Sequence, residues 1–277
     1  MLTGRRGQLG VELERRLAPL ASVIATDRSS LDLASEEALR RAVREARPDV
    51  IVNAAAYTAV ARAETERAAA LRINAAAPGI LAEEARALGA LLVHYSTDYV
   101  FDGAKRSPYG EDDAPGPLNA YGASKLEGEL RVRASGCRAL IVRSSWLYAP
   151  HGGNFYRTIA ARAAAGERLR VVDDQHGVPS SAAFVAAGSV ELLRKNVEGL
   201  FHLVPSGEAT WFEFARAILD KMGSHAPIER VRTGEYPDPV RRPAYSVLDN
   251  AKAARALGHP LEHWHELLAA MEEPVLL

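Results

Sequence analysis

Short apolar runs alternate with longer amphipathic segments along the first half of the chain. Each run is bounded by glycine, proline or polar residues, which is typical of buried strands. The predicted strands lie at 1–3, 22–26, 50–55, 90–96 and 139–148. The segments between them repeat apolar residues at helical spacing and predict helices over 34–46, 64–72 and 77–88 and from Tyr121 onward. Strands that alternate with helices form parallel sheets with right-handed crossovers, so we expect an α/β fold.

The pattern is less regular beyond Pro150. It predicts helices over 155–165, 182–194 and 211–221, a strand beginning near 168 and another over 200–204. The last strand can return to the main sheet, whereas the proline-rich tail fits a smaller lobe over one sheet edge. We therefore assign 1–150, joined by about 171–204, to a doubly wound parallel sheet, and 151–170 with 205–277 to a C-terminal lobe.

Composition excludes several classes of function. The formal net charge is −1, so no basic field marks a nucleic-acid-binding protein. No apolar run reaches the length of a membrane span. Cys137 is the single cysteine, which rules out an internal disulfide and fits the reducing cytoplasm. We expect a cytoplasmic protein whose partners are neither nucleic acid nor membrane.

A glycine-rich turn follows the first predicted strand. Gly4, Gly7 and Gly10 are spaced G-x-x-G-x-x-G, and a helical pattern follows them. Glycine allows a tight turn and close approach of the backbone to a ligand, and a helix N-terminus offers free N–H groups to a pyrophosphate. This spacing between a strand and a helix indicates a dinucleotide site, so the sheet is expected to be of the Rossmann type.

The residues after the second predicted strand are candidates for the adenosine end of that dinucleotide. Asp27 lies about 20 residues past the glycines, where an acid commonly accepts hydrogen bonds from the ribose of NADH. Arg5, Arg6 and Arg28 are instead suited to the 2′-phosphate of NADPH. Asp32 is a second candidate acid or the start of the next helix. The sequence leaves NADH against NADPH open.

Further candidate residues gather at the carboxyl ends of the predicted strands, the edge at which open parallel sheets bind ligands. Ala54, Ala55 and Ala56 precede Tyr57 at the end of the third strand, and their small side chains leave room for a flat ligand. Segment 95–98 ends the fourth strand. The glycine turn and Asp27 fall at the same edge, so we expect one site there.

Tyr121 and Lys125 open the helix after the fourth strand and share one helical face, because they are four positions apart. A free phenol titrates near pH ~10, and an ammonium group one turn away lowers its pKa. Tyr121 is therefore a candidate proton donor to a ketone under reduction, with Lys125 as its electrostatic partner. Thr97 can donate to the carbonyl oxygen and stabilise the charge that grows there.

Six segments spread from residue 3 to 249 carry a family resemblance. They are T-G-R-R-G-Q-L-G, P-D-V-I-V-N-A-A-A-Y-T-A-V, H-Y-S-T-D-Y-V-F-D-G, P-L-N-A-Y-G-A-S-K-L-E-G-E, R-S-S-W-L-Y and R-R-P-A-Y-S-V-L-D. Together they resemble the extended branch of the short-chain dehydrogenase/reductase superfamily, and within it the dTDP-4-dehydrorhamnose reductase family. The resemblance implies that NADPH or NADH reduces the 4-keto group of a dTDP-4-dehydro-L-rhamnose substrate, with the dTDP-sugar bound in the C-terminal lobe.

The resemblance also implies residue roles. Thr97, Tyr121 and Lys125 match the family's catalytic hydroxyl, acid and lysine, and Thr97, Asp98 and Trp146 match positions that meet the sugar nucleotide. The cofactor set expected from the resemblance and the sheet edge together is Gly4, Gly7, Gln8, Leu9, Asp27, Asp32, Leu33, Ala54, Ala55, Ala56, Tyr57, Thr58, Tyr95, Tyr121 and Lys125. Many members have histidine in place of Tyr57.

Metal binding and assembly are less defined by the resemblance. Some family members bind Mg²⁺ at a dimer contact, but this sequence shows no clear ligand cluster for the ion. His94 and His176 lack the paired spacing of metal ligands. Mg²⁺ and a homodimer therefore stay open as expectations.

Two other classes of protein are compatible with the same motifs. An epimerase or dehydratase of this branch would share the fold, Tyr121 and Lys125. Such dehydratases typically place an Asp-Glu pair after the threonine, whereas here Asp98 is followed by Tyr99. A non-enzymatic partner protein, such as the regulatory subunit of methionine adenosyltransferase, also resembles this family. Retention of Thr97, Tyr121 and Lys125 favours catalysis.

Overall fold

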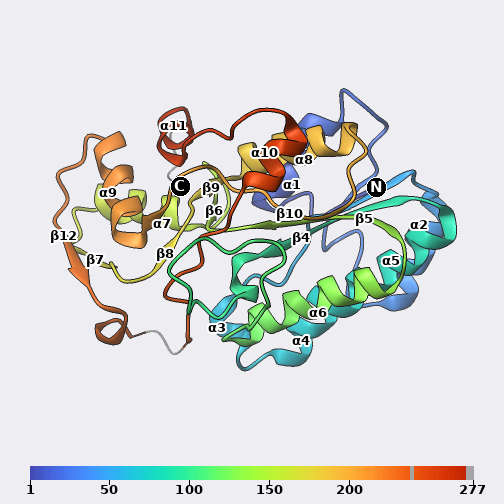
Figure 1. The fold of residues 1–277 in the computed structure, drawn as a ribbon, viewed down its shortest axis with the longest axis horizontal. Helices are drawn as coiled ribbons and strands as arrows, with labels where there is room; N and C mark the ends of the chain where they lie inside the picture. Colours follow the sequence, from blue (N-terminus) through green and yellow to red (C-terminus); the bar gives the residue numbers. More distant parts are fainter. Residues whose placement is uncertain (238–239, 273–277) are drawn as a thin grey trace.

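A six-stranded parallel sheet lies between two layers of helices in the computed structural model, which describes residues 1–237 and 240–272 (Figure 1). The strand order is β10-β5-β4-β3-β1-β2. The strands are β1 (Leu2–Thr3), β2 (Ala25–Thr26), β3 (Val50–Asn53), β4 (Leu91–Thr97), β5 (Arg138–Ser144) and β10 (Gly199–His202). The predicted α/β fold with a parallel sheet is confirmed.

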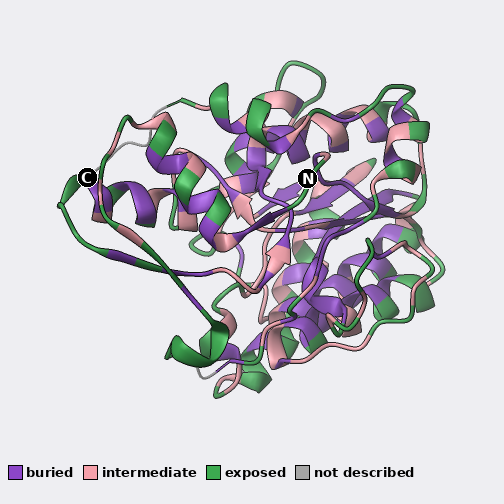
Figure 2. Ribbon diagram, turned by 60° about the vertical axis from the view of Figure 1, so that its left-hand side comes forward, coloured by how far each residue is buried: buried purple, intermediate pink, exposed green. Residues whose placement is uncertain are grey.

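The two faces of the sheet bury different helices because side chains alternate along each strand. Leu2, Val52 and Val93 face one layer, while Ile51 and Leu92 face the other. The first layer holds α1 (Gln8–Leu17), α8 (Ala182–Arg194) and α10 (Ala251–Leu257). The second holds α2 (Glu36–Ala46), α5 (Ala77–Leu88) and α6 (Ala120–Ala134). Figure 2 shows the resulting buried centre, with exposed residues on the outer helices.

The chain reverses its direction across the sheet at β1. This strand pairs with β2 on one side and with β3 on the other, so the crevice outside their carboxyl ends is a topological switch point. Ligands of open parallel sheets bind at such a point. We call the carboxyl ends of β1, β3 and β4, with the residues that follow each strand, the active edge.

Three predicted elements differ in detail from the structure. The helix predicted over 64–72 is divided into α3 (Val60–Ala63) and α4 (Arg67–Leu71), followed by a π-helical turn (Arg72–Ala76). The strand predicted over 139–148 stops at Ser144 and resumes as β6 (Leu147–Tyr148), because Trp146 has a φ of 42°. The second strand covers only Ala25–Thr26 of the predicted 22–26.

A smaller region lies beside the large sheet, at the left of Figure 1. Its core joins α7 (Phe155–Ala164), α9 (Trp211–Lys221) and α11 (Trp264–Ala269). β7 (Leu169–Val172) pairs in parallel with β12 (Ile228–Val231). Shorter pairs join β8 (His176–Gly177) to β11 (Ala209–Thr210), and β6 to β9 (Ser180–Ser181). β12 was not predicted from the sequence.

The segments that follow β7 divide between the two regions. Within the segment 171–204, α8 and β10 pack with the large sheet, whereas β7 does not pair with it. From the tail, α10 packs on α8 and β10. Residues 238–239 and 273–277 of the predicted lobe lie outside the described residues.

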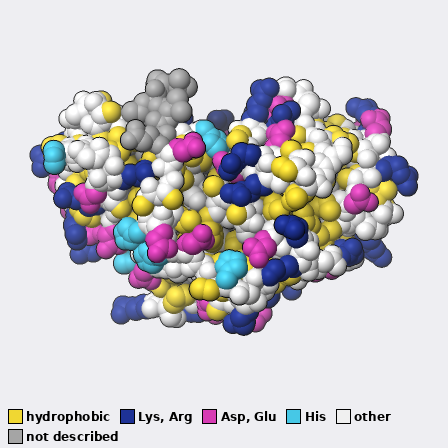
Figure 3. All heavy atoms as spheres, turned by 90° about the horizontal axis from the view of Figure 1, so that it is seen from above, with side chains coloured by type: hydrophobic (Ala, Val, Ile, Leu, Met, Phe, Trp, Pro, Cys, Tyr) yellow, Lys and Arg dark blue, Asp and Glu magenta, His cyan; other side chains and the backbone are white. Residues whose placement is uncertain are grey.

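The face of the molecule seen from above Figure 1 carries mixed charge. In Figure 3, which views the molecule from above Figure 1, basic and acidic side chains are interspersed. None of the helices within residues 1–237 and 240–272 combines the length and hydropathy that crossing a bilayer requires.

Candidate active site

The glycine turn after β1 packs directly against the loop after β3. Gly4 has a φ of 78°, and a Cβ placed on it would lie 2.8 Å from the Ala55 Cα. A Cβ on Gly10 would lie 2.0 Å from the Gly4 carbonyl oxygen. Side chains at both positions would therefore fill the space in which the two backbones meet. The predicted glycine turn and alanine loop are adjacent at the switch point, as a dinucleotide cradle requires.

The N-terminus of α1 faces this turn. Gly7 is its N-cap residue and supplies no side-chain hydrogen bond to the free N–H groups. Gln8 accepts a hydrogen bond through Oε1 from Asn154 Nδ2 at 2.8 Å, which ties the turn to the start of α7. Leu9 is buried in the core, so its backbone is the part that remains for a ligand. Free N–H groups at a helix N-terminus suit a pyrophosphate.

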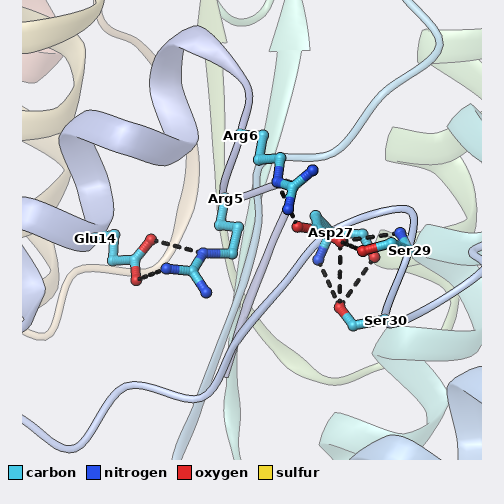
Figure 4. Close-up of polar contacts among 6 residues, drawn as sticks. All are labelled: Arg5, Arg6, Glu14, Asp27, Ser29 and Ser30. Carbon is cyan, nitrogen blue, oxygen red and sulfur yellow. Dashed lines mark hydrogen bonds and ion pairs between the residues drawn. The ribbon is translucent and has the colours of Figure 1, made fainter.

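Asp27 is held by Arg6 and by its own turn, as Figure 4 shows. Arg6 Nε lies 2.8 Å from Asp27 Oδ2. Asp27 Oδ1 accepts from the Ser29 backbone N–H at 2.9 Å and from the Ser29 hydroxyl at 2.5 Å. The Ser29 hydroxyl is the main cause that lowers the pKa of Asp27, with Arg6 as a smaller one. Both carboxylate oxygens of Asp27 are therefore engaged.

The two arginines of the glycine turn point in different directions (Figure 4). Arg5 makes a two-pronged contact with Glu14 of α1, with its closer nitrogen–oxygen distance at 2.8 Å. The side chain of Arg6 instead reaches Asp27, directly after β2. Asp32 accepts a hydrogen bond from the Ala34 backbone N–H at 2.9 Å, which fits a turn residue before α2, and Leu33 packs against the core.

Asn74 holds the loop after β3 against α6. Its Oδ1 accepts from the Tyr57 N–H at 2.8 Å, and its Nδ2 donates to the Tyr57 carbonyl at 3.0 Å and to Ser124 Oγ at 2.9 Å. Asn74 is buried in the π-helical turn, an irregularity often found at functional sites. Sequence reasoning gave Asn74 no role; a lone asparagine in an alanine-rich segment was the available signal.

Lys125 is buried beneath the end of β4. Asn119 caps α6 by accepting from the Gly122 N–H at 2.9 Å, which sets where the helix begins. Lys125 is 3% exposed, and its Nζ donates to the Tyr95 carbonyl at 2.6 Å. Burial lowers the pKa of Lys125 to about 8, and the charge of Glu129 opposes that change. Tyr95 thus contributes to the site through its backbone.

Thr97 and Tyr121 meet at the same edge. Thr97 Oγ1 donates to Asp98 Oδ1 at 3.0 Å and accepts from the Tyr99 N–H at 3.2 Å. Burial raises the pKa of Tyr121, and its contact with the Thr97 hydroxyl works against that rise. Burial is the largest influence on this pKa, and the lowering by Lys125 that the sequence predicts stays a prediction. Tyr121 carries its proton at neutral pH, as a proton donor must.

The C-terminal segment also reaches this edge. Ser246 Oγ donates to Asp98 Oδ2 at 2.6 Å, and Arg242 donates to the Tyr99 hydroxyl at 2.8 Å. Burial raises the pKa of Asp98 to about 6, against the hydrogen bonds from Ser246 and Thr97. The Tyr99 ring packs edge-on to Tyr121, with the centroids 5.9 Å apart. The segment R-R-P-A-Y-S-V-L-D contributes to the family resemblance, but the sequence did not predict its contacts with Asp98 and Tyr99.

Trp146 lies in the smaller region. Its ring stacks on Trp211 with the centroids 3.6 Å apart and an interplanar angle of 7°. A Cβ on Gly177 would lie 2.4 Å from the Trp146 ring, so the indole packs flat over that backbone. The contacts described for Trp146 are with this region, and its role toward a sugar nucleotide stays a prediction.

The described residues contain no cluster of three or more His, Cys, Asp or Glu side chains suited to a metal ion.

The switch-point glycine turn, with Thr97, Tyr121 and Lys125 at the same edge, defines a class of protein, the extended short-chain dehydrogenases/reductases. Residues 1–276 match the family model described as the RmlD substrate binding domain, and the chain belongs to this family.

Relatives and solved structures named dTDP-4-dehydrorhamnose reductase agree with this assignment. The chain is 43% identical over 281 residues to the dTDP-4-dehydrorhamnose reductase of Burkholderia thailandensis, covering 95% of this chain and 94% of the relative. The crystal structure of a Clostridium acetobutylicum dTDP-4-dehydrorhamnose reductase matches with a TM-score of 0.94 at 37% identity, over 98% of this chain and 96% of that one. The Bacillus anthracis reductase in complex with NADP matches with a TM-score of 0.94 at 35% identity, with the same coverage.

Proposed function

We propose that this chain is a dTDP-4-dehydrorhamnose reductase, which reduces the 4-keto group of dTDP-4-dehydro-L-rhamnose with NADPH. The observation that supports it most is the convergence of Thr97, Tyr121 and Lys125 on the edge that also carries the glycine turn. The full-length identity to reductases of that name supports the substrate. Segments 151–170 and 205–277 are the proposed sugar-nucleotide lobe, in a cytoplasmic protein for which a homodimer stays an expectation.

The site residues divide the work of a ketone reduction. The reduced nicotinamide supplies a hydride to C4 when the cofactor is bound. Tyr121, protonated at rest, delivers the proton to the developing alkoxide oxygen. The Thr97 hydroxyl, held by Asp98 and the Tyr99 N–H, lies beside Tyr121 and can turn to donate to the same oxygen. Lys125, one helical turn after Tyr121, donates to the Tyr95 carbonyl at the same edge, and we assign its ammonium group to the nicotinamide ribose.

The geometry at β2 favours NADPH over NADH. Arg6 uses Nε for Asp27, while its side chain is 79% exposed, so its terminal nitrogens can pair with a 2′-phosphate. Asp27 Oδ1 already accepts twice from Ser29, so a ribose 2′-hydroxyl would have to share Oδ2 with Arg6. We therefore propose that Asp27 orients Arg6 toward the 2′-phosphate. The acid and the arginine, which the sequence assigned to different cofactors, then both serve NADPH.

Substitutions at this ribose end test the cofactor assignment. Arg6→Ala is expected to raise the KM for NADPH by roughly 10-fold or more, the scale of a lost charge-assisted hydrogen bond, with little change for NADH. Arg5→Ala is the matched control, because Arg5 pairs with Glu14. Asp27→Asn should also weaken NADPH binding by loosening Arg6. If Asp27→Asn instead weakens NADH and strengthens NADPH, Asp27 reads the ribose directly and this assignment is wrong.

The function itself is tested by oxidation of NADPH with dTDP-4-dehydro-L-rhamnose as the acceptor. The product sugar is then identified by NMR. We expect dTDP-L-rhamnose; formation of its C4 epimer, or no oxidation with this substrate, would contradict the proposed reaction.

A further inference from the structure

Helix α6 buries an unusually polar face against the sheet. Helices normally pack on a sheet through an apolar stripe. The buried residues of α6 include Ser124, Lys125 and Glu129. Glu129 is 1% exposed and lies one turn beyond Lys125 on the same face. The proposed mechanism uses Lys125 but gives no role to this buried carboxylate.

Arg143 of β5 clamps Glu129 from the sheet side. Arg143 Nε and a terminal nitrogen donate to the two Glu129 oxygens at 2.8 and 2.7 Å. Such a two-pronged contact fixes orientation as well as distance. Arg143 is 3% exposed, packs over the Phe101 ring at 5.0 Å and lies 3.3 Å from His202 Nε2. We call Glu129 and Arg143 the α6 clamp.

The α6 clamp connects the helix that carries Tyr121 and Lys125 to β5, the strand that pairs with the Thr97 strand β4. In the ladder between β4 and β5, Arg143 pairs with Ser96, next to Thr97. A buried ion pair seldom adds net stability, because desolvation offsets the attraction, but its geometry can specify one arrangement. The contact between Glu129 and Arg143 therefore fixes the position of α6 relative to the sheet at a point close to Thr97.

Glu129 also supplies a negative charge to the surroundings of Lys125. Lys125 Nζ donates to the Tyr95 carbonyl. The titratable and charged side chains on the elements packed around it are Tyr121 and Glu129 on α6, His94 on β4, Asp98 and Tyr99 after β4, and Arg143 on β5. Burial lowers the pKa of His94 well below its usual range, so His94 is uncharged. Among the described residues, Glu129 is the group whose charge opposes the effect of burial on Lys125.

We propose that Glu129 is a positioning residue of the reductase: held by Arg143, it fixes α6 over the sheet and keeps Lys125 in its ammonium form. This role rests on the proposed function, because it assigns Lys125 to that reaction. Glu129 itself does not touch the reacting atoms.

The test compares Glu129→Gln with Glu127→Gln. Glu127 lies on the same helix and pairs with Arg131 at 2.8 Å, but on an exposed face. In Glu129→Gln, the alkaline limb of the kcat/KM profile for NADPH oxidation should move to lower pH by about 1 unit, a usual effect of one nearby charge. Glu127→Gln should leave the limb unchanged. A merely structural loss would lower kcat at every pH without moving the limb.

A second readout does not depend on the substrate. The ¹³Cε resonance of Lys125, identified by its absence in Lys125→Met, reports the titration of the ammonium group. The same acid shift is expected in Glu129→Gln. An inactive wild-type enzyme would count against the proposed reaction, whereas an unshifted Lys125 titration would overturn the role of Glu129.

Glu129→Gln leaves the buried Arg143 without its counter-charge and can unfold for that reason. The double variant Glu129→Gln/Arg143→Gln replaces both charges by amides and should fold. It should also show an acid shift, smaller than that of the single variant, because loss of the Arg143 positive charge partly offsets loss of the Glu129 negative charge. An unshifted titration in the folded double variant, or failure of the double variant to fold, would overturn the proposal by making the pair a folding determinant only.

Discussion

At the scale of single residues, Tyr121 carries the proton that we assign to the reduction. Burial raises the pKa of this phenol, so the resting enzyme holds the proton that reduction consumes. Tyr121→Phe should lower kcat by at least ~10²-fold, the usual scale for loss of a general acid, with NADPH binding retained. The control is Tyr148→Phe, since the buried Tyr148 hydroxyl has no hydrogen-bond partner among the described residues. Near-normal turnover in Tyr121→Phe would refute its role.

Ionisation of Asp98 makes the free energy of unfolding depend on pH. Its pKa is raised to about 6 by burial, whereas an unfolded aspartate titrates near ~3.9. The stability this group contributes is full below pH ~4 and is lost as pH rises through 6. Asp98→Asn cannot ionise, so its Tm relative to wild type should be higher at pH 7.5 than at pH 4.5.

The control for that measurement is Asp102→Asn. The Tyr109 hydroxyl lowers the pKa of Asp102, so both its folded and unfolded forms are ionised across this window. Its Tm relative to wild type should not gain with pH. An equal gain in both variants would show that the trend does not come from Asp98.

Residue types and spacing predicted which side chains could carry out the chemistry. They did not predict the hydrogen bonds that hold those side chains in place. Tyr121 and Lys125 are four residues apart, so helical periodicity alone places them together. Ser246 reaches Asp98 across 148 positions, and Asn74 reaches Ser124 across 50. No periodicity links such distant residues, because the packing of separate elements decides which of them meet.

At the scale of elements, long apolar strands and periodic helices could be predicted, whereas short or irregular elements could not. β4 is buried along its whole length, and its apolar run marks it clearly. β12 exposes Glu229 and Arg230, and its pattern resembles a loop. The break at Trp146 depends on a left-handed backbone conformation held by Trp211 and Gly177, which local sequence does not reveal.

The close approach of α6 to the π-helical turn yields a prediction at this scale. A Cβ on Gly128 would lie 2.1 Å from the Asn74 carbonyl oxygen. Gly128→Ala should therefore destabilise the protein by about 1–3 kcal/mol, as overpacking does. Displacement of Asn74 should also release the Tyr57 loop and raise the KM for NADPH.

Thermal unfolding and steady-state kinetics of Gly128→Ala check both parts of that prediction. Gly153→Ala is the control, because no atom lies within 4 Å of its added Cβ. Unchanged stability in Gly128→Ala would mean that α6 does not need this close contact.

At the scale of the whole molecule, the chain returns from its C-terminal part to the strand that carries Thr97. Segment 242–246 contacts both residues that follow Thr97, through Arg242 to Tyr99 and Ser246 to Asp98. Tyr99 in turn packs on Tyr121. Hydrogen bonds thus couple the proposed sugar-nucleotide lobe to the residues beside the reacting groups.

This coupling predicts separate effects on the two substrates. Arg242→Met removes the bond to the Tyr99 hydroxyl but leaves the glycine turn and Arg6 intact, so kcat/KM for the dTDP-sugar should fall by roughly 10-fold, the scale of one charge-assisted hydrogen bond. The KM for NADPH should stay unchanged. Arg241→Met is the matched control, because Arg241 is exposed and the contact described for it uses its backbone carbonyl, which accepts from Asn119. Steady-state kinetics with each substrate varied in turn distinguish the outcomes. A larger effect on NADPH than on the sugar would place Arg242 with the cofactor and remove the basis for this coupling.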